Sequence, residues 1–182
     1  MLDGIYKEVA PSYVVLNEFK AGKLAAKYFL EHGHNNLCMV TTDKRMDALE
    51  RQRGFESQLE TSPHIVTWDL EFEKKLLILL QNHPEITGIF CYNDLASQEC
   101  YNILLSHGYN IPDDISIISM DDTVIASTIT PTLTSVSHPK NRMGKSAAQA
   151  LLDIKNKKLS WPYQKTFESS IIQRDSVKSL NN

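Results

Sequence analysis

The sequence contains little cysteine, little glycine and no excess of basic residues. Its three cysteines, Cys38, Cys91 and Cys100, are an odd number without a CxxC spacing, so neither a disulfide framework nor a cysteine-based zinc site is expected. The seven glycines do not cluster, and GxGxxG, GxxxxGK[ST] and GxSxG patterns are absent, which disfavours dinucleotide, phosphate-loop and hydrolase functions. A formal net charge of −3 argues against DNA binding by this chain alone, because phosphate contacts require basic side chains.

Long hydrophobic runs are missing as well. No window approaches the roughly 18 apolar residues of a membrane span. The first residues, MLDGIYKEVAPS, lack the basic and then apolar pattern of a secretion signal, so a cytoplasmic protein is expected. The length of 182 residues suits one domain and a fraction of another.

Short β-branched runs alternate with longer amphipathic stretches, a pattern typical of βαβ units around a parallel sheet. Strands are expected at residues 13–16, 37–40, 65–68, 87–91, 115–119, 133–136 and 168–173. Helices are expected at residues 21–32, 47–59, 72–81, 94–106 and 139–156, with 121–130 a loop or short helix and 175–182 a frayed tail. The sequence therefore predicts an α/β fold with a doubly wound parallel sheet of four or five strands.

Ligands of such sheets bind beyond the carboxyl ends of the strands, where this sequence places short polar side chains. Asp94 follows one strand and is suited to cap the next helix. Asp121 and Asp122 follow another strand and, being adjacent, point apart, which argues against a carboxylate pair for acid–base work. Arg51 follows a polar loop; its planar fork suits two vicinal hydroxyls or a carboxylate, although a solvated helix face is the common alternative.

Metal-binding and nucleophilic patterns are weak. His32 and His34 form an HxH triplet around Gly33, but the glycine marks a helix end and no third ligand lies nearby, so no metal site is expected. Cys91 has no histidine close in sequence and sits in an apolar run, which disfavours a nucleophile. The residues alone indicate a small-molecule-binding fold without evident catalytic machinery or cofactor. An enzyme relying on Asp121 or His138 is the less favoured alternative.

Several segments, in this order, resemble the ligand domain of the LacI/GalR repressor family. They are residues 17–22 (NEFKAG), 30–34 (LEHGH), 51–55 (RQRGF), 90–94 (FCYND), 111–122 (IPDDISIISMDD) and 131–136 (PTLTSV). Residues 91–94, 133–140 and 143–148 look most like the arabinose-responsive repressors of Gram-positive bacteria. Those repressors carry a GntR-type winged-helix DNA-binding domain ahead of the sugar domain.

The resemblance implies a periplasmic-binding-protein-like type I fold, in which two α/β subdomains close on a sugar. By motif, Arg51 and Asp121 would hydrogen-bond sugar hydroxyls, with Asn93 beside them. His138 stands in a crossover segment where it would contact the ligand. Trp68 follows a strand where relatives place an aromatic residue to stack on the sugar ring, and ordinary packing is the equal alternative for it.

The resemblance also implies how the chain is divided. Residues 1–17 would be a remnant of the N-terminal subdomain and residues 18–136 the C-terminal sensor subdomain. Residues 137–160 would form a crossover and helix of the N-terminal subdomain, and 161–182 a return strand to the C-terminal subdomain and a tail. The chain is thus expected to be mostly the C-terminal subdomain, as a fragment without the first βα units of its partner and without a DNA-binding domain.

The expected function is to sense a sugar effector, L-arabinose or a similar one, and to dimerise as part of a bacterial repressor of carbohydrate metabolism. The homodimer would use the helix at 94–106 and the segment at 123–130, where Val124, Ile125 and Ile129 offer an apolar patch. DNA would be reached only through a domain absent from this chain, and no membrane partner is expected. A sugar-binding component of a transport system with the same fold is the alternative.

Overall fold

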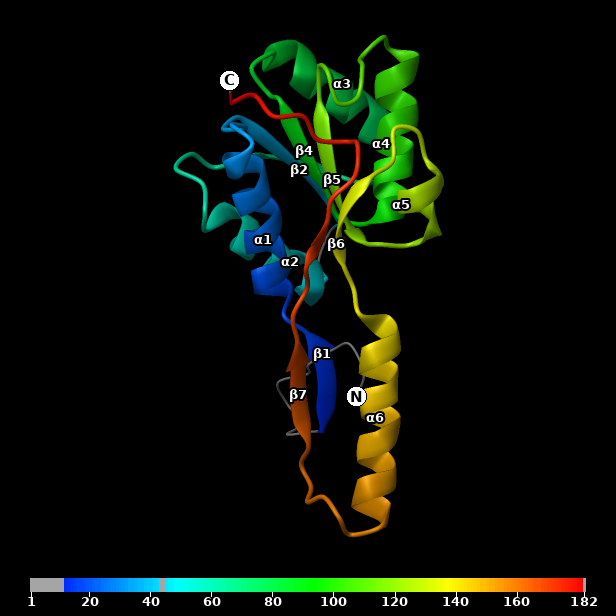
Figure 1. Ribbon diagram of the computed structural model, residues 1–182. Helices are drawn as coiled ribbons and strands as arrows, with labels where there is room; N and C mark the ends of the chain where they lie inside the picture. The colour runs from blue at the N-terminus through cyan, green and yellow to red at the C-terminus, as the bar shows by residue number, and fades with distance from the viewer. Residues whose placement is uncertain (1–11, 43–44, 182) are drawn as a thin grey trace. The chain divides into compact units, whose positions relative to one another are not determined.

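The computed structural model describes residues 12–42 and 45–181, which fall into two compact units (Figure 1). The smaller unit comprises Met1–Asn17 and His138–Ser169, and the larger comprises Glu18–Ser137 and Ser170–Asn182. The compact smaller unit extends to Ser169, whereas the sequence places the return to the C-terminal subdomain at residue 161. Among the described residues, no helix is long and apolar enough to cross a membrane.

The larger unit is built on a six-stranded sheet in the order β3-β2-β4-β5-β6-β8. Its strands are β2 (Leu37–Thr41), β3 (His64–Thr67), β4 (Gly88–Cys91), β5 (Ser116–Asp121), β6 (Thr134–Ser137) and β8 (Ile171–Ile172). The first five are parallel and β8 runs antiparallel to β6. All four residues of β4 are buried, as expected for a central parallel strand covered on both faces. The predicted parallel α/β sheet is confirmed.

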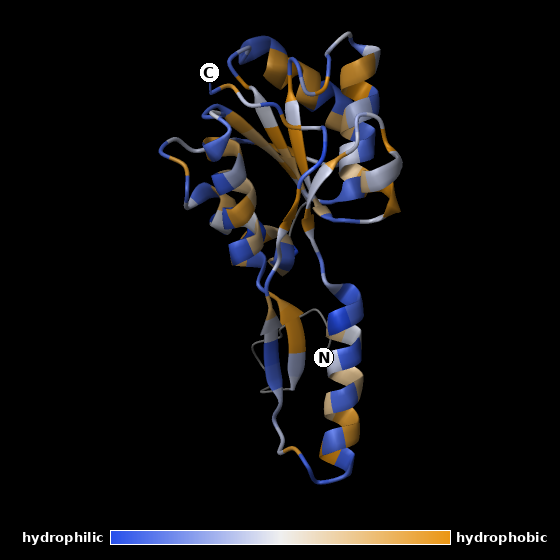
Figure 2. Ribbon diagram, in the orientation of Figure 1, coloured by the Kyte–Doolittle hydropathy of each residue, from blue (hydrophilic) through white to orange (hydrophobic). Residues whose placement is uncertain are grey.

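Helices cover both faces of this sheet (Figure 1). One layer is formed by α1 (Glu18–Glu31) and α2 (Met46–Glu56), and the other by α3 (Phe72–Asn82), α4 (Asp94–Ser106) and α5 (Val124–Thr128). Phe90 of β4 stacks on Phe55 of α2 with ring centroids 5.1 Å apart, whereas its neighbour Ile89 packs in a cluster with Leu76 and Leu104 of the opposite layer. Figure 2 shows the apolar residues concentrated along the strands and the helix faces of this unit.

The helices α1 and α2 approach each other backbone to backbone at two glycines. A Cβ atom on Gly22 would lie 1.9 Å from the carbonyl oxygen of Arg51, and one on Gly54 would lie 1.9 Å from that of Phe19. No other residue fits at either position without moving a helix. This contact fixes the position of Arg51 relative to the first turn of α1.

The smaller unit contains β1 (Tyr13–Leu16), α6 (Lys140–Lys155) and β7 (Gln164–Phe167). The strands β1 and β7 pair in parallel, with Tyr13 opposite Gln164. The strand expected at 168–173 is present only as the two-residue β8, which joins the larger sheet, and β7 before it is not expected from the sequence.

The C-terminal segment is anchored to the larger sheet rather than frayed. The hydroxyl of Ser176 is buried, donates to the carbonyl of Ile117 over 2.6 Å and accepts from the amide of Thr134 over 2.8 Å. The amide of Lys178 bonds the hydroxyl of Ser116 over 3.2 Å. These bonds satisfy polar groups of β5 and β6 that would otherwise be buried without partners.

Candidate functional site

The carboxyl ends of β4 and β5 place polar residues at one edge of the larger sheet. Asn93 follows β4, and Asp121 is the last residue of β5, which pairs with β4 in parallel. Arg51 reaches the same edge, where its Nη1 donates to the carbonyl oxygen of Tyr92. We call this group of residues the polar edge; it comprises Glu18, Arg51, Tyr92, Asn93 and Asp121.

Arg51 is buried and its orientation is set by neighbours. Its Nη2 and Nε donate to the same carboxylate oxygen of Glu18 over 2.7 and 3.0 Å, and its guanidinium lies 4.8 Å from the centre of the Tyr92 ring. A guanidinium has five N–H groups, and these bonds with the one to Tyr92 use three of them. The other two make no hydrogen bond within the described part of the chain. Arg51 therefore does not lie on a solvent-exposed helix face. It is a buried hydrogen-bond donor whose orientation is set by Glu18 and Tyr92.

A second ion pair extends the network at Tyr92. Its hydroxyl donates to Oδ2 of Asp47 over 2.7 Å, and Asp47 also accepts from Nε of Arg45 over 3.0 Å. Burial, followed by the bond to Asp47, raises the pKa of Tyr92 to about 12. Burial opposes ionisation of Asp47, but the hydrogen bonds from Arg45 and Tyr92 outweigh it and hold the pKa of Asp47 below its ordinary value. The phenol is thus neutral and the carboxylate charged at neutral pH.

Asn93, not Asp94, caps α4. The Oδ1 of Asn93 accepts from the amide of Ala96 over 2.8 Å. Asp94 is buried and accepts from the amide and hydroxyl of Thr123 over 2.6 and 2.8 Å and from the hydroxyl of Ser135 over 3.1 Å. The expected capping role of Asp94 is wrong: its carboxylate joins α4 to the segments that follow β5 and begin β6.

Asp121 and Asp122 both have left-handed backbone conformations, with φ of 106° and 50°. Such values are uncommon for residues with a Cβ, and the strain persists only where surrounding contacts impose it. Asp122 supplies such contacts, because its Oδ1 accepts from Nη2 of Arg174 over 2.6 Å and its amide donates to Ser135 over 3.1 Å. The half-buried Asp121 is thereby held at the carboxyl end of β5.

The two remaining candidate residues lie elsewhere. Trp68 follows β3, is half-buried against the core, and donates its indole N–H to Glu99 of α4 over 2.6 Å. His138 belongs to the smaller unit, so the structure does not join it to the polar edge. The packing alternative for Trp68 thus has direct support, and a stacking role for it stays a prediction.

Sequence reasoning missed Glu18, Tyr92 and Asp47. Each partners a residue far along the chain: Glu18 bonds Arg51, and Tyr92 bonds Asp47. The sequence offers one signal for the contact between Glu18 and Arg51. Each of the two helices contains one glycine, which permits a close crossing, and the two side chains carry opposite charges.

The histidines of the HxH triplet have separate structural roles. His34 is buried between the hydroxyl of Thr87, 2.9 Å from Nδ1, and the carbonyl of Lys178, 3.0 Å from Nε2. His32 stacks on Tyr28 with centroids 4.2 Å apart. Burial lowers the pKa of His34 and favours its neutral form.

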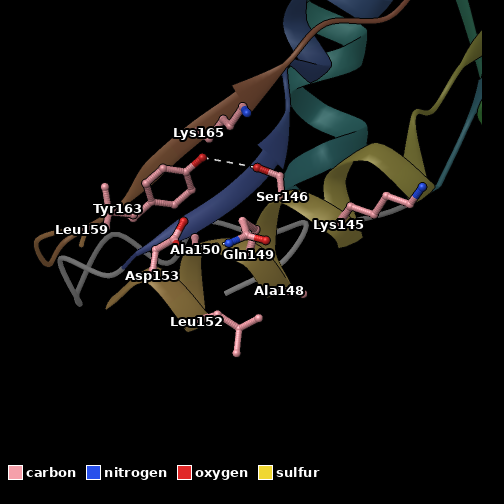
Figure 3. A pocket seen from close by; sticks show the side chains of 10 residues that line it. All are labelled: Lys145, Ser146, Ala148, Gln149, Ala150, Leu152, Asp153, Leu159, Tyr163 and Lys165. Atoms are coloured by element: carbon pink, nitrogen blue, oxygen red, sulfur yellow. Dashed lines mark hydrogen bonds between the residues drawn. The ribbon is translucent and has the colours of Figure 1, made fainter. Parts of the chain in front are cut away.

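The smaller unit has a shallow pocket of about 650 Å³ between α6 and the segment around β7 (Figure 3). Its lining includes Lys145, Gln149 and Lys165, and a hydrogen bond of 3.3 Å joins Ser146 to Tyr163. None of the five residues predicted from the sequence to bind ligand lines this pocket.

Residues 26–177 match the model of the periplasmic binding protein-like domain family. The chain belongs to this family. Curated relatives include the HTH-type transcriptional repressor PurR of Vibrio parahaemolyticus, 31% identical over 92% of this chain and 53% of the relative. PurR of Photobacterium profundum is 29% identical over 91% of this chain and 52% of the relative. The chain spans about half the length of these relatives, which are named as repressors and not as enzymes.

Solved structures give the same family. A LacI-family transcriptional regulator from Enterococcus faecalis V583 with bound ribose has a TM-score of 0.87 and 26% identity, covering 99% of this chain and 68% of the regulator. The complex of the transcriptional regulator CelR with cellobiose has a TM-score of 0.80 at 22% identity, covers 95% of this chain and 56% of that one, and supports the fold alone. The chain is thus a periplasmic binding protein-like domain of the kind found in LacI-family regulators, and the type I fold is confirmed.

Proposed function

We propose that this chain is the effector-sensing part of a bacterial transcriptional repressor and that its effector is a small sugar. The observation that carries the proposal is the polar edge. There the buried Arg51 of α2 bonds the residue that follows β4, and the conformationally strained Asp121 ends the neighbouring parallel strand β5. The ribose bound to the Enterococcus faecalis regulator, a relative at 26% identity, supports a sugar as the ligand class.

The polar edge has the donors and acceptors that a sugar requires. A sugar hydroxyl both donates and accepts, so it pairs with an arginine N–H on one side and a carboxylate oxygen on the other. Arg51 supplies two N–H groups in one plane, and Asp121 supplies the carboxylate. Hydrogen bonds to charged groups contribute about 1.5–3 kcal/mol each, which is enough to select a polyol over an apolar ligand.

The other proposed ligand contacts come from Asn93, Trp68 and His138. The Asn93 carbonyl oxygen is engaged in capping, which leaves its amide as the group offered to a ligand. The bond from Trp68 to Glu99 would fix the plane of the indole for stacking. A contact from His138 rests on the family resemblance alone.

The identity of the sugar is a finer hypothesis. The segments at 91–94, 133–140 and 143–148 favour L-arabinose and a GntR-type winged helix ahead of the chain, whereas the ribose-bound neighbour favours D-ribose. Either sugar would act by binding one arrangement of the whole cytoplasmic repressor more tightly than another, since only differential affinity shifts such an equilibrium. The repressor names of the relatives support this function over a transport component.

The test is calorimetric titration of L-arabinose and D-ribose into the whole repressor and two of its variants. Asp121→Asn removes the carboxylate charge at the polar edge, and we expect binding at least about tenfold weaker. Asp113→Asn is the matched control, because Asp113 is exposed in the turn before β5, and it should bind like wild type. Equal affinity of the two variants would overturn the site, and failure of both pentoses to bind would overturn the proposed ligand class.

A further inference from the structure

Two histidines and a glutamate converge at the end of the larger sheet opposite the polar edge. His64 is the first residue of the edge strand β3, and His83 and Glu85 lie in the connection from α3 to β4. One potential ligand atom from each residue lies within 4.8 Å of the others. No spacing pattern in the sequence indicates this group, because His64 comes from a separate strand.

The backbone around this cluster is well held. The amide of His83 bonds the carbonyl of Leu79 over 2.9 Å, and its own carbonyl accepts from Ile86 over 3.1 Å. His64 is in register with Cys38 in the parallel pairing of β3 with β2. The three side chains therefore project from fixed positions, and they are half-buried or exposed, so they can change rotamer at little cost.

The two imidazole rings lie against each other. Their centroids are 4.0 Å apart with a 40° angle between the planes, and Nδ1 of His83 is 3.1 Å from Oε1 of Glu85. Two imidazole rings and a carboxylate, which are common protein ligands of transition-metal ions, are therefore already close together.

We propose that His64, His83 and Glu85 bind a divalent transition-metal ion, with Zn²⁺ as the fitting ion. Two imidazole nitrogens and one carboxylate oxygen are ligands that zinc takes at about 2.0–2.2 Å in tetrahedral geometry. Ligand atoms in such a tetrahedron are roughly 3.3 Å apart, so rotamer changes of these side chains would close the site. A water would occupy the fourth position.

Bound metal would join the free edge of the sheet to the connection that leads into β4. It would therefore link two segments of the larger unit that are 19 residues or more apart in the sequence. This proposal does not depend on the sugar site, because its three ligands are not part of the polar edge.

The test is calorimetric titration of Zn²⁺ alone into the protein in a buffer that does not chelate metal. We expect one equivalent to bind, and binding at least tenfold weaker in Glu85→Gln and in His83→Asn. Glu85 has a half-exposed side chain, so its substitution should leave the fold intact. The matched control is His107→Asn. His107 lies 3.9 Å from one carboxylate, that of Glu73, and belongs to no group of three potential metal ligands within the described residues.

Zinc should also raise the melting temperature of wild type and of His107→Asn, but not of Glu85→Gln or His83→Asn. Unchanged affinity in both ligand variants would overturn the site. So would loss of binding in His107→Asn, or several weak equivalents that persist in every variant, which would indicate adventitious surface binding.

Discussion

Arg51 of α2 and Glu18 of α1 form an ion pair of 2.7 Å in which the two side chains are only 4% and 14% exposed. The pair holds the arginine in one orientation at the polar edge before any ligand arrives. A ligand that meets an oriented donor loses less binding free energy to side-chain ordering. The ion pair therefore connects the packing of two helices to the proposed recognition of sugar.

Replacing Glu18 with glutamine should destabilise the larger unit. The change leaves the Arg51 guanidinium buried without its counter-charge, which costs about 3–5 kcal/mol in comparable sites. Urea unfolding would measure the loss. The control is Glu50→Gln, whose pair with Arg53 is exposed and should change stability by less than about 1 kcal/mol. Equal effects of the two substitutions would contradict the assigned burial.

Replacing a helical glycine with alanine should have opposite effects at the α1–α2 crossing and in α6. Gly54→Ala places a Cβ 1.9 Å from the Phe19 carbonyl oxygen and should destabilise the larger unit by about 1–3 kcal/mol or more. Gly144→Ala in α6 meets nothing within 4 Å and should stabilise its helix by roughly 0.5–1 kcal/mol. Circular dichroism during thermal unfolding would compare them, and stabilisation by Gly54→Ala would refute the close approach.

His34 should make stability depend on pH. Burial lowers its folded-state pKa below the ordinary value of 6.5, so the unfolded chain takes up a proton first as pH falls. Stability should therefore decrease as pH drops from 6.5 towards the lowered folded-state pKa. Denaturant unfolding at several pH values would measure this slope. It should be reduced in His34→Gln and kept in His32→Gln, and an identical slope in the two variants would exclude His34 as its source.

If the chain forms the expected homodimer, a substitution in the interface should lower its molecular mass in solution from dimer towards monomer. Val124 of α5 and Leu95 of α4 are 72% and 53% exposed, so both side chains are available to an interface that uses these two helices. Sedimentation at rising concentration should show dimer for wild type and a shift towards monomer for Val124→Glu. Ile78→Glu, on the exposed side of α3, is the control and should remain dimeric. A Val124→Glu protein as dimeric as wild type would place the interface elsewhere.

The sequence predicts the sheet well because its strands are short and buried on both faces. All four residues of Gly88–Cys91 and five of the six of Ser116–Asp121 are buried, and both strands contain apolar residues in succession, Ile89–Cys91 in one and Ile117–Ile118 in the other. The strand Gln164–Phe167 is largely exposed and is not expected from the sequence, because its pairing with β1 is not encoded in its own polarity pattern.

The side-chain roles are less predictable because partners distant in the sequence decide them. Asn93 and Asp94 are equally suited by residue type to cap a helix. Asn93 caps α4, because the carboxylate of Asp94 is bonded to Thr123 and Ser135 instead. The sequence alone is equally compatible with an exposed and with a buried Arg51. The helix crossing decides between them, because it places Glu18 beside the arginine.

The most direct test of the proposed sugar site compares two arginines of the same helix. Arg51→Lys keeps a positive charge beside Glu18 but removes the planar N–H pair offered to the ligand, whereas Arg53→Lys alters an exposed side chain. In pentose titrations of the whole repressor, Arg51→Lys should bind at least about tenfold more weakly than wild type, and Arg53→Lys should match wild type. Equal pentose affinity of Arg51→Lys and wild type would contradict the account.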